Sequence, residues 1–180
     1  MSGRDSTRQK LLAAAAEVAR EQGSGNLSLD AIALRAGVSK GGLLYHFPTK
    51  AALLRALVQH FISEFESQLE VAAQTKTHGN ALAAYIHLTE AETAKPSPGA
   101  AGVLAAMAED PDFLKPVKAF QRRLLDRLQK EAHDPADVLL VYLALEGLRS
   151  MNLFEIDVLS KDEIDLAVKA MLDRAGVLHQ

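Results

Sequence analysis

Helix-capping and helix-breaking residues divide this chain into short segments, and their positions limit the folds that the chain can adopt. Between the breakers Ala, Leu, Glu, Lys and Gln dominate, and no stretch alternates apolar and polar residues as a strand would. The expected fold is therefore all-α, with about nine helices. They are expected near residues 6–22, 28–35, 39–47, 50–75, 80–94, 100–108, from 110 onward, 134–152 and 160–175.

Individual caps fix several of these boundaries. The pairs Ser6–Gln9 and Ser160–Glu163 have the spacing of capping boxes, in which two side chains satisfy orphan backbone donors reciprocally. Asp134-Pro135 combines an N-cap with proline at the first helical position, which predicts a helix start. Asp110-Pro111 gives the same signal, although Pro116 is expected to kink or restart that helix.

Two neighbouring helices are too short to be stable alone, and they are joined by the three-residue break Gly37-Val38-Ser39. A short glycine-containing turn between two such helices is typical of a helix-turn-helix, here about residues 28–47. In this motif the second helix enters the major groove of DNA. The apolar packing positions are Ile32, Ala33, Val38, Leu43 and Phe47.

Turning the second helix by about 100° per residue separates its buried and outward sides. Leu43 and Phe47 define the buried direction, and Tyr45 lies opposite. Gly41 and Gly42 share the outward side, where they let the backbone approach another surface closely. A flexible turn without a partner is the alternative interpretation of these two glycines. The flanking residues are Lys40, Leu44 and His46.

The motif continues beyond this helix as Ile32-Ala33-x-x-Ala36-Gly37-Val38-Ser39-x-Gly41-x-Leu43-x-Tyr45-His46-Phe47-x-x-Lys50-x-x-Leu53. With these residues the chain resembles the N-terminal domain of TetR/AcrR-type transcriptional regulators, over roughly residues 7–54. The Tyr-His-Phe…Lys tail makes the resemblance more specific than a general helix-turn-helix. The family usually has Tyr at the position of Leu44, often as a phosphate contact, so that contact is expected to be missing or shifted to Tyr45.

The resemblance implies a DNA-binding domain over residues 1–50 and an effector-binding and dimerisation domain over residues 51–180. It implies a homodimer on a pseudo-palindromic double-stranded operator, acting as a repressor that a small, apolar effector releases. The break at Pro96–Gly102 is the expected hinge. The expected DNA-binding residues are Ser28, Ser39, Lys40, Gly41, Gly42, Tyr45, His46 and Lys50, with Lys50 on a phosphate as the family motif places it.

The distribution of charge agrees with a DNA-binding N-terminus, although the whole chain has a formal net charge of −3. Residues 1–50 carry seven Lys or Arg and four acidic side chains, whereas the remainder carries 13 basic and 19 acidic ones. This asymmetry suggests a polyanion-facing domain on an acidic body. Chance scatter of a few charges accounts for it equally well.

Dimerisation is also expected from the residues themselves. The segment Val138–Leu145 is apolar all round, so that one side can meet the core while the other needs a partner. Pairing the helices of about residues 135–152 and 161–175 with their copies would form a four-helix interface. A single fully buried core helix is the alternative. The stripe expected on the last helix is Ile164, Ala167, Val168, Met171, Leu172 and Ala175.

The sequence is less informative about the residues that recognise an effector. The candidate pocket residues are Tyr85, Met107, Phe120, Tyr142, Glu146 and Arg149, with Phe113 among further aromatic candidates. Ordinary packing is the alternative for each. The six histidines form no i, i+4 ligand pair and cysteine is absent, so that neither a metal site nor a cofactor is expected.

The remaining function classes have little support in the sequence. No phosphate-binding loop, dinucleotide fingerprint, nucleophile elbow or His-Glu-x-x-His motif occurs, so that an enzyme is not expected. The alternatives left open are a small-ligand-binding helical enzyme and a protein-interaction adaptor, each carrying a helix-turn-helix. No apolar run is long enough to span a bilayer and no signal-peptide pattern occurs, so that the expected location is the cytoplasm.

Overall fold

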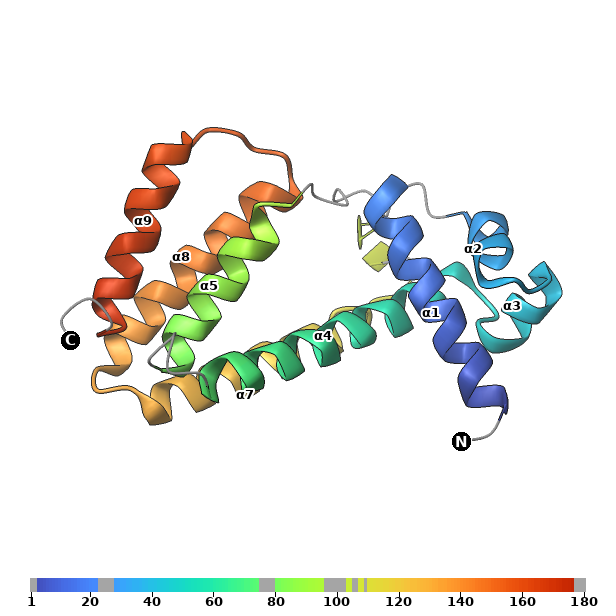
Figure 1. Ribbon diagram of the computed structural model, residues 1–180, viewed down its shortest axis with the longest axis horizontal. Helices are drawn as coiled ribbons and strands as arrows, with labels where there is room; N and C mark the ends of the chain where they lie inside the picture. Colours follow the sequence, from blue (N-terminus) through green and yellow to red (C-terminus); the bar gives the residue numbers. More distant parts are fainter. Residues whose placement is uncertain are drawn as a thin grey trace. The chain divides into compact units, whose positions relative to one another are not determined.

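The computed structural model describes a helical chain, and its described residues contain eight helices and no strand (Figure 1). This confirms the predicted all-α class. Most of the short helix expected over 100–108 lies outside the described residues. The described residues are 3–22, 28–74, 80–95, 103–104, 107–108 and 110–176. The chain divides into a first unit, Met1–Ile62 with Ser97–Val117, and a second unit, Ser63–Pro96 with Lys118–Gln180.

The first unit is built around three helices: α1 (Gly3–Gln22), α2 (Leu29–Ala36) and α3 (Lys40–His46). The start of α4 (Lys50–Gln74) completes it. One apolar core joins these helices, and Phe113 from far along the chain is buried in it at 2% exposure. Other members of this core are Leu11, Ala15, Val18, Ile32, Leu43, Phe47, Leu53 and Leu57. The helix-turn-helix is therefore packed partly by a segment that follows the fifth helix.

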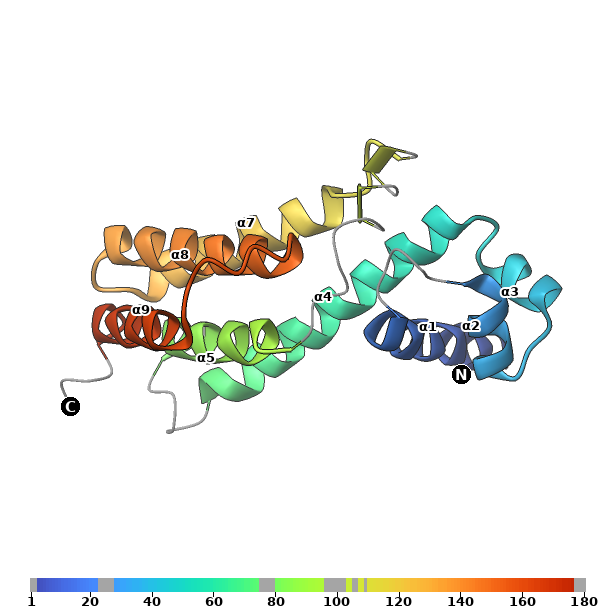
Figure 2. The same cartoon turned by 90° about the horizontal axis from the view of Figure 1, so that it is seen from above.

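The second unit contains α5 (Ala81–Thr93), α8 (Pro135–Leu153), α9 (Lys161–Arg174) and most of α7 (Lys115–Glu131). In Figure 2 it forms two layers, with α7 and α8 in one and α5 and α9 in the other. Helix α5 packs against both α8 and α9. The fully buried side chains of this unit include Tyr85, Ile86, Val138, Val141 and Leu145. None of the described helices is long and apolar enough to cross a membrane.

Side-chain oxygens cap the starts of several helices, and the caps predicted at Asp134 and at Ser160 with Glu163 are among them. Thr49 Oγ1 accepts from the N–H of Ala52 at 3.0 Å, and Asn80 Oδ1 accepts from that of Ala83 at 2.9 Å. Asp134 caps α8, and Ser160 with Glu163 forms a complete capping box on α9. These contacts satisfy backbone donors that have no acceptor within their helix.

Two of the predicted helix starts are corrected. Helix α1 begins at Gly3, so that Ser6 lies inside it, exposed, and the capping box with Gln9 is wrong. A cap at Ser6 is not needed, because the helix already begins three residues earlier. Asp110 opens a turn rather than a helix, and α7 begins at Lys115. Pro116 enforces this restart because its ring would clash with the carbonyl of the residue four earlier in a longer helix.

Candidate nucleic-acid interface

The turn between α2 and α3 is fixed by one glycine and two serines. Gly37 has a φ of 68°, and Val38 N–H donates to the Ala33 carbonyl at 3.0 Å, which closes the end of α2. A side chain with a Cβ is strained in this left-handed conformation. Ser28 Oγ accepts from the Ala31 N–H at 3.3 Å, and Ser39 Oγ accepts from the Gly42 N–H at 3.1 Å. The angle between the two helices is thus set by local chemistry.

Helix α3 has the predicted buried and outward sides. Leu43 is 0% exposed and Phe47 is 2% exposed, whereas Tyr45 on the opposite side is 61% exposed. Leu44 lies on the flank at 37% exposure. His46 is half-buried and makes an edge-to-face contact with Tyr45, with ring centres 5.3 Å apart. The side of α3 that carries Tyr45 is therefore open to a partner.

Packing within the first unit does not require glycine at the two outward positions of α3. A Cβ on Gly41 would meet only Ser39 Oγ, at 3.9 Å. A Cβ on Gly42 would meet the same oxygen at 3.4 Å and Val38 Cβ at 3.8 Å. All three distances are ordinary van der Waals contacts. Exposed Gly41 and half-buried Gly42, two residues of poor helix propensity, therefore have no reason in the packing of this unit to be glycine.

Ion pairs inside the first unit neutralise part of its positive charge. Arg35 binds Glu21 through two hydrogen bonds of 2.8 and 2.7 Å, and it also reaches Glu17 at 3.4 Å. The hydrogen bond from Arg35 holds the pKa of Glu21 below its ordinary value. Lys40 Nζ lies 2.9 Å from Asp30 Oδ2. The excess of positive charge counted along residues 1–50 is therefore not all available to a polyanion.

Lys50 stands at the first position of α4, half-buried, and it has no ion-pair partner within the described part of the chain. Arg8 of α1 lies with its guanidinium carbon 5.2 Å from the centre of the Phe47 ring. The structure thus places Ser39 and five α3 residues on or beside one short helix, with Ser28 and Lys50 at the starts of the helices before and after it. All eight predicted DNA-binding residues thus belong to the first unit.

The predicted effector residues fall into two groups. Tyr85 of α5 and Glu146 and Arg149 of α8 form a connected cluster in the second unit. The Tyr85 hydroxyl donates to Glu146 Oε1 at 3.1 Å, and Arg149 Nη1 donates to both of those oxygens at 2.9 Å. Met107 belongs to the first unit, where it is 40% exposed.

Two further residues complete this arrangement, which we name the Arg149 cluster: Tyr85, Glu92, Gln121, Glu146 and Arg149. Gln121 Nε2 donates to Glu146 Oε2 at 2.9 Å, and Arg149 Nη2 donates to Glu92 Oε2 at 3.0 Å. The Arg149 guanidinium also lies 5.2 Å from the centre of the Phe65 ring. Phe65, Glu92 and Gln121 were not expected from the sequence, because nothing local distinguishes them from solvated or packing residues of an ordinary helix.

Aromatic rings and burial define the surroundings of this cluster. Phe65 makes edge-to-face contacts with Tyr85 and with the predicted residue Phe120, with ring centres 6.1 and 5.9 Å apart. Burial raises the pKa of Tyr85, so that its phenol stays neutral and can donate. Burial raises the pKa of Tyr142 as well. One turn beyond Tyr85, the hydroxyl of Thr89 is buried and has no hydrogen-bond partner among the described residues.

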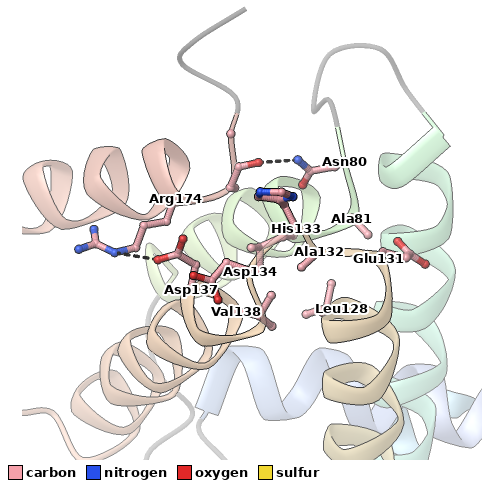
Figure 3. Close-up of a pocket in the computed structure, with 13 residues that line it drawn as sticks. Asn80, Ala81, Leu128, Glu131, Ala132, His133, Asp134, Asp137, Val138 and Arg174 are labelled. Carbon is pink, nitrogen blue, oxygen red and sulfur yellow. Dashed lines mark hydrogen bonds and ion pairs between the residues drawn. The ribbon is translucent and has the colours of Figure 1, made fainter.

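A separate cavity of about 380 Å³ lies where α5, α7, α8 and α9 end or begin (Figure 3). Its wall includes His133, Asp134 and Asp137, and Asn80 donates across it to the Ala175 carbonyl at 2.6 Å. It contains none of the predicted effector residues. Its acidic groups are engaged in caps and ion pairs, such as Asp137 with Arg174 at 3.5 Å. Among the described residues no group of three or more side chains suits a metal ion.

Several apolar side chains on the outer side of α8 are exposed in the described part of the chain. Val138, Val141 and Leu145 are fully buried, whereas Leu139, Leu140 and Leu143 are 40, 56 and 65% exposed. We name these three leucines with Leu166 of α9, which is 68% exposed, the outer apolar face. Val168 and Met171, which were assigned to a dimer stripe, are instead buried at 6 and 5% exposure within the chain's own fold.

Comparisons with known proteins agree with this architecture. Residues 79–176 match the tetracyclin repressor-like C-terminal domain, and residues 11–57 match the bacterial regulatory proteins of the tetR family. The HTH-type transcriptional activator FasR of Mycolicibacterium smegmatis is 40% identical over 74 residues, which are 41% of this chain and 34% of that protein. The chain thus matches about a third of the length of this curated relative.

Solved structures show the same fold. A TetR transcriptional regulator from Rhodococcus sp. RHA1 superposes with a TM-score of 0.60 at 22% identity, covering 99% of this chain and 100% of that one. A transcriptional regulator of the TerR/AcrR family from Aquifex aeolicus VF5 gives a TM-score of 0.54 at 18% identity, covering 96% of this chain and 99% of that one.

A helix-turn-helix followed by a larger helical unit defines a DNA-binding transcriptional regulator. The chain belongs to the TetR family of such regulators. Members of this family bind DNA operators, act as dimers and respond to small-molecule effectors, and the family is not normally enzymatic. The predicted family and function class are therefore confirmed, and neither the enzyme nor the adaptor alternative is supported.

Proposed function

We propose that this chain is a homodimeric repressor of the cytoplasm, which binds a pseudo-palindromic operator and is released by a small effector. The DNA-binding function is assigned to residues 1–50 and the effector and dimer functions to residues 51–180. The single observation that carries the DNA site is the open side of α3, where exposed Tyr45 adjoins two glycines that packing does not require. Those glycines let the α3 backbone approach the floor of the major groove.

The DNA-contact residues are proposed as Ser28, Ser39, Lys40, Gly41, Gly42, Tyr45, His46 and Lys50. The first step of a test is selection of bound duplexes from a random pool with the full-length protein, which supplies the operator. Gly41→Ala then separates folding from DNA binding. A Cβ there meets nothing closer than 3.9 Å, and alanine is favoured over glycine in a helix by about 1 kcal/mol.

Gly41→Ala should therefore keep or raise the melting temperature while operator affinity falls at least tenfold. Tyr45→Ala should weaken operator binding, whereas Val71→Ala, a control on an exposed α4 position, should not. Unchanged operator affinity of both α3 variants would contradict the proposed interface. Transcription in vitro from a promoter that overlaps the selected site tests the direction of regulation, and activation instead of repression would refute the repressor assignment.

The effector is proposed to contact Tyr85, Phe120, Tyr142, Glu146 and Arg149, which all belong to the second unit, and Met107 of the first unit is left out of this site. The support is the combination of aromatic rings with a buried, hydrogen-bonded charge pair in the second unit. The buried hydroxyl of Thr89 is a further polar group that a bound molecule could satisfy. Thr89→Val removes this hydroxyl at nearly constant volume, so that it should leave operator affinity intact and change the effector concentration needed for release.

The dimer is proposed to form through α8 and α9, with the outer apolar face at its centre. Exposed leucines at these four positions would be covered by the same helices of a second copy, as a two-fold interface requires. The hinge proposed at Pro96–Gly102 lies outside the described residues. Replacing Gly99 and Gly102 by Ala tests it, since unchanged effector response and operator affinity would remove its basis.

A further inference from the structure

One acidic residue of the first unit lies beside the proposed DNA-contact residues. Asp30, in the first turn of α2, places Oδ2 2.9 Å from Nζ of Lys40, the first residue of α3. Both side chains are exposed, at 69 and 54%. The pair therefore links the starts of α2 and α3 at the surface. Asp30 follows the cap Ser28 by two residues, and Lys40 follows the cap Ser39 by one.

Stability does not explain this pair, because exposed ion pairs contribute little to folding. The two helices are already held by the turn at Gly37 and by the buried Ile32 and Leu43. Arg35, another paired cation of the first unit, binds acids of α1 and so joins two helices of the core. Asp30, by contrast, engages a side chain at the N-terminus of the recognition helix.

We propose that Asp30 is a specificity-determining residue, which acts through Lys40 to suppress binding to DNA that lacks the operator sequence. This inference rests on the proposed role of Lys40. A lysine ammonium has three N–H donors, and a carboxylate that accepts one leaves two for the acceptors of a guanine edge. A phosphate of nonspecific DNA competes with Asp30 for the Lys40 ammonium. Lys40 therefore adds little to the affinity for nonspecific DNA.

Contact between Lys40 and nonspecific DNA therefore releases few counterions, because Asp30 already neutralises the Lys40 ammonium. Removing the carboxylate should free the ammonium for any phosphate and add one ionic contact per subunit. Each such contact steepens the dependence of log affinity on log salt by about 0.9. The expected signature is a gain in nonspecific binding with a loss of discrimination.

The test uses the full-length dimer, its selected operator and a scrambled duplex of equal length, titrated at four salt concentrations. Asp30→Asn should bind the scrambled duplex about three- to tenfold more tightly at low salt, with operator affinity changed less than twofold. The salt slope on the scrambled duplex should steepen by about one per subunit. Asp30→Glu, which keeps the charge, should retain most of the discrimination of the wild type.

Two controls separate this role from a general charge effect. Asp112→Asn removes an acid of the same unit that is paired with Lys115 at 2.8 Å, and it should change neither the discrimination nor the slope. In a Lys40→Met background, Asp30→Asn only removes a charge that repels phosphate, so that it should strengthen binding to both duplexes equally and leave the discrimination unchanged. With Lys40 present, equal gains of Asp30→Asn on both duplexes would overturn the inference, as would an equal effect of Asp112→Asn or a loss of discrimination that persists without Lys40. A wild-type protein with no sequence preference would instead contradict the proposed function.

Discussion

Arg149 and Tyr85 contact each other in two ways in the second unit. The guanidinium carbon of Arg149 lies 5.3 Å from the centre of the Tyr85 ring, and Arg149 Nη1 donates to the Tyr85 hydroxyl at 2.9 Å. The hydroxyl donates in turn to Glu146, so that the phenol links the cation and the carboxylate. Arg149 is only 22% exposed, and a charge pair at such a depth depends on every hydrogen bond that satisfies it.

Tyr85→Phe should therefore destabilise the protein, because it leaves Arg149 short of an acceptor and Glu146 short of a donor. The expected loss is about 1–3 kcal/mol in the free energy of unfolding, measured by denaturant titration. Tyr142→Phe is the matched control on α8, since its hydroxyl makes no hydrogen bond among the described residues and its loss should cost under about 0.5 kcal/mol. Equal losses for the two variants would refute this role of the Tyr85 hydroxyl.

The outer apolar face should control assembly. Leu140→Glu and Leu143→Glu place charges where a second copy would bury them, so that each should give a folded monomer at micromolar concentration by sedimentation velocity. Val71→Glu, on an exposed position of α4, should stay dimeric. Val168→Glu should unfold the second unit rather than dissociate it, because Val168 is 6% exposed within the chain itself. A wild-type monomer would remove the basis of the interface.

Phe113 should be essential to the first unit although it lies far from the helix-turn-helix in sequence. It is 2% exposed in the same core as Leu43 and Leu57, so that Phe113→Ala should cost about 3–5 kcal/mol. Operator binding should fall with it, as the positions of α3 depend on that core. Leu104→Ala is the control, because Leu104 is 52% exposed and its loss should be nearly neutral. Both can be measured by thermal unfolding and by operator titration.

The capping box of α9 predicts a dependence on pH. Hydrogen bonds from the backbone N–H and hydroxyl of Ser160 hold the pKa of Glu163 below its ordinary value. The folded pKa is thus lower than the unfolded one, so that the stabilisation is present above the unfolded pKa of 4.5 and is lost as the pH falls through the folded value. Glu163→Ala should lower the melting temperature at pH 7 and have little effect near pH 3. An equal decrease at both pH values would contradict this assignment.

The part of the fold that could be predicted depends on contacts between residues that are close in the sequence. Caps such as Asp134 and Ser160 act on backbone groups two or three residues away, so that sequence spacing alone specifies them. The outward position of Tyr45 followed from helical periodicity for the same reason. The capping box at Ser6 failed because spacing cannot tell a helix start from a position inside a helix.

Long-range packing explains what could not be predicted. Phe113 was a pocket candidate because it is aromatic, and only the tertiary fold buries it in the first unit. The residues of the Arg149 cluster lie on α5, α7 and α8, and no pattern within one helix reveals that Gln121 meets Glu146. Val168 was assigned to the dimer stripe because periodicity gives a helix an apolar side without saying which neighbour covers it.

Lys50 and Lys40 should differ in what they contribute to DNA binding. Lys50 has no ion-pair partner among the described residues, so that Lys50→Ala should weaken operator and scrambled duplex alike and lower the salt slope by about one per subunit. Lys40→Ala would also leave Asp30 unpaired and repelling phosphate. The comparison is therefore made in the Asp30→Asn background, where loss of Lys40 should reduce preference at particular base pairs by about 1–3 kcal/mol. Titrations of both duplexes at two salt concentrations measure the two effects, and Lys10→Ala on exposed α1 is the control for charge alone. Equal losses on both duplexes would make Lys40 a phosphate contact and leave Tyr45 and the backbone at Gly41 to read the bases.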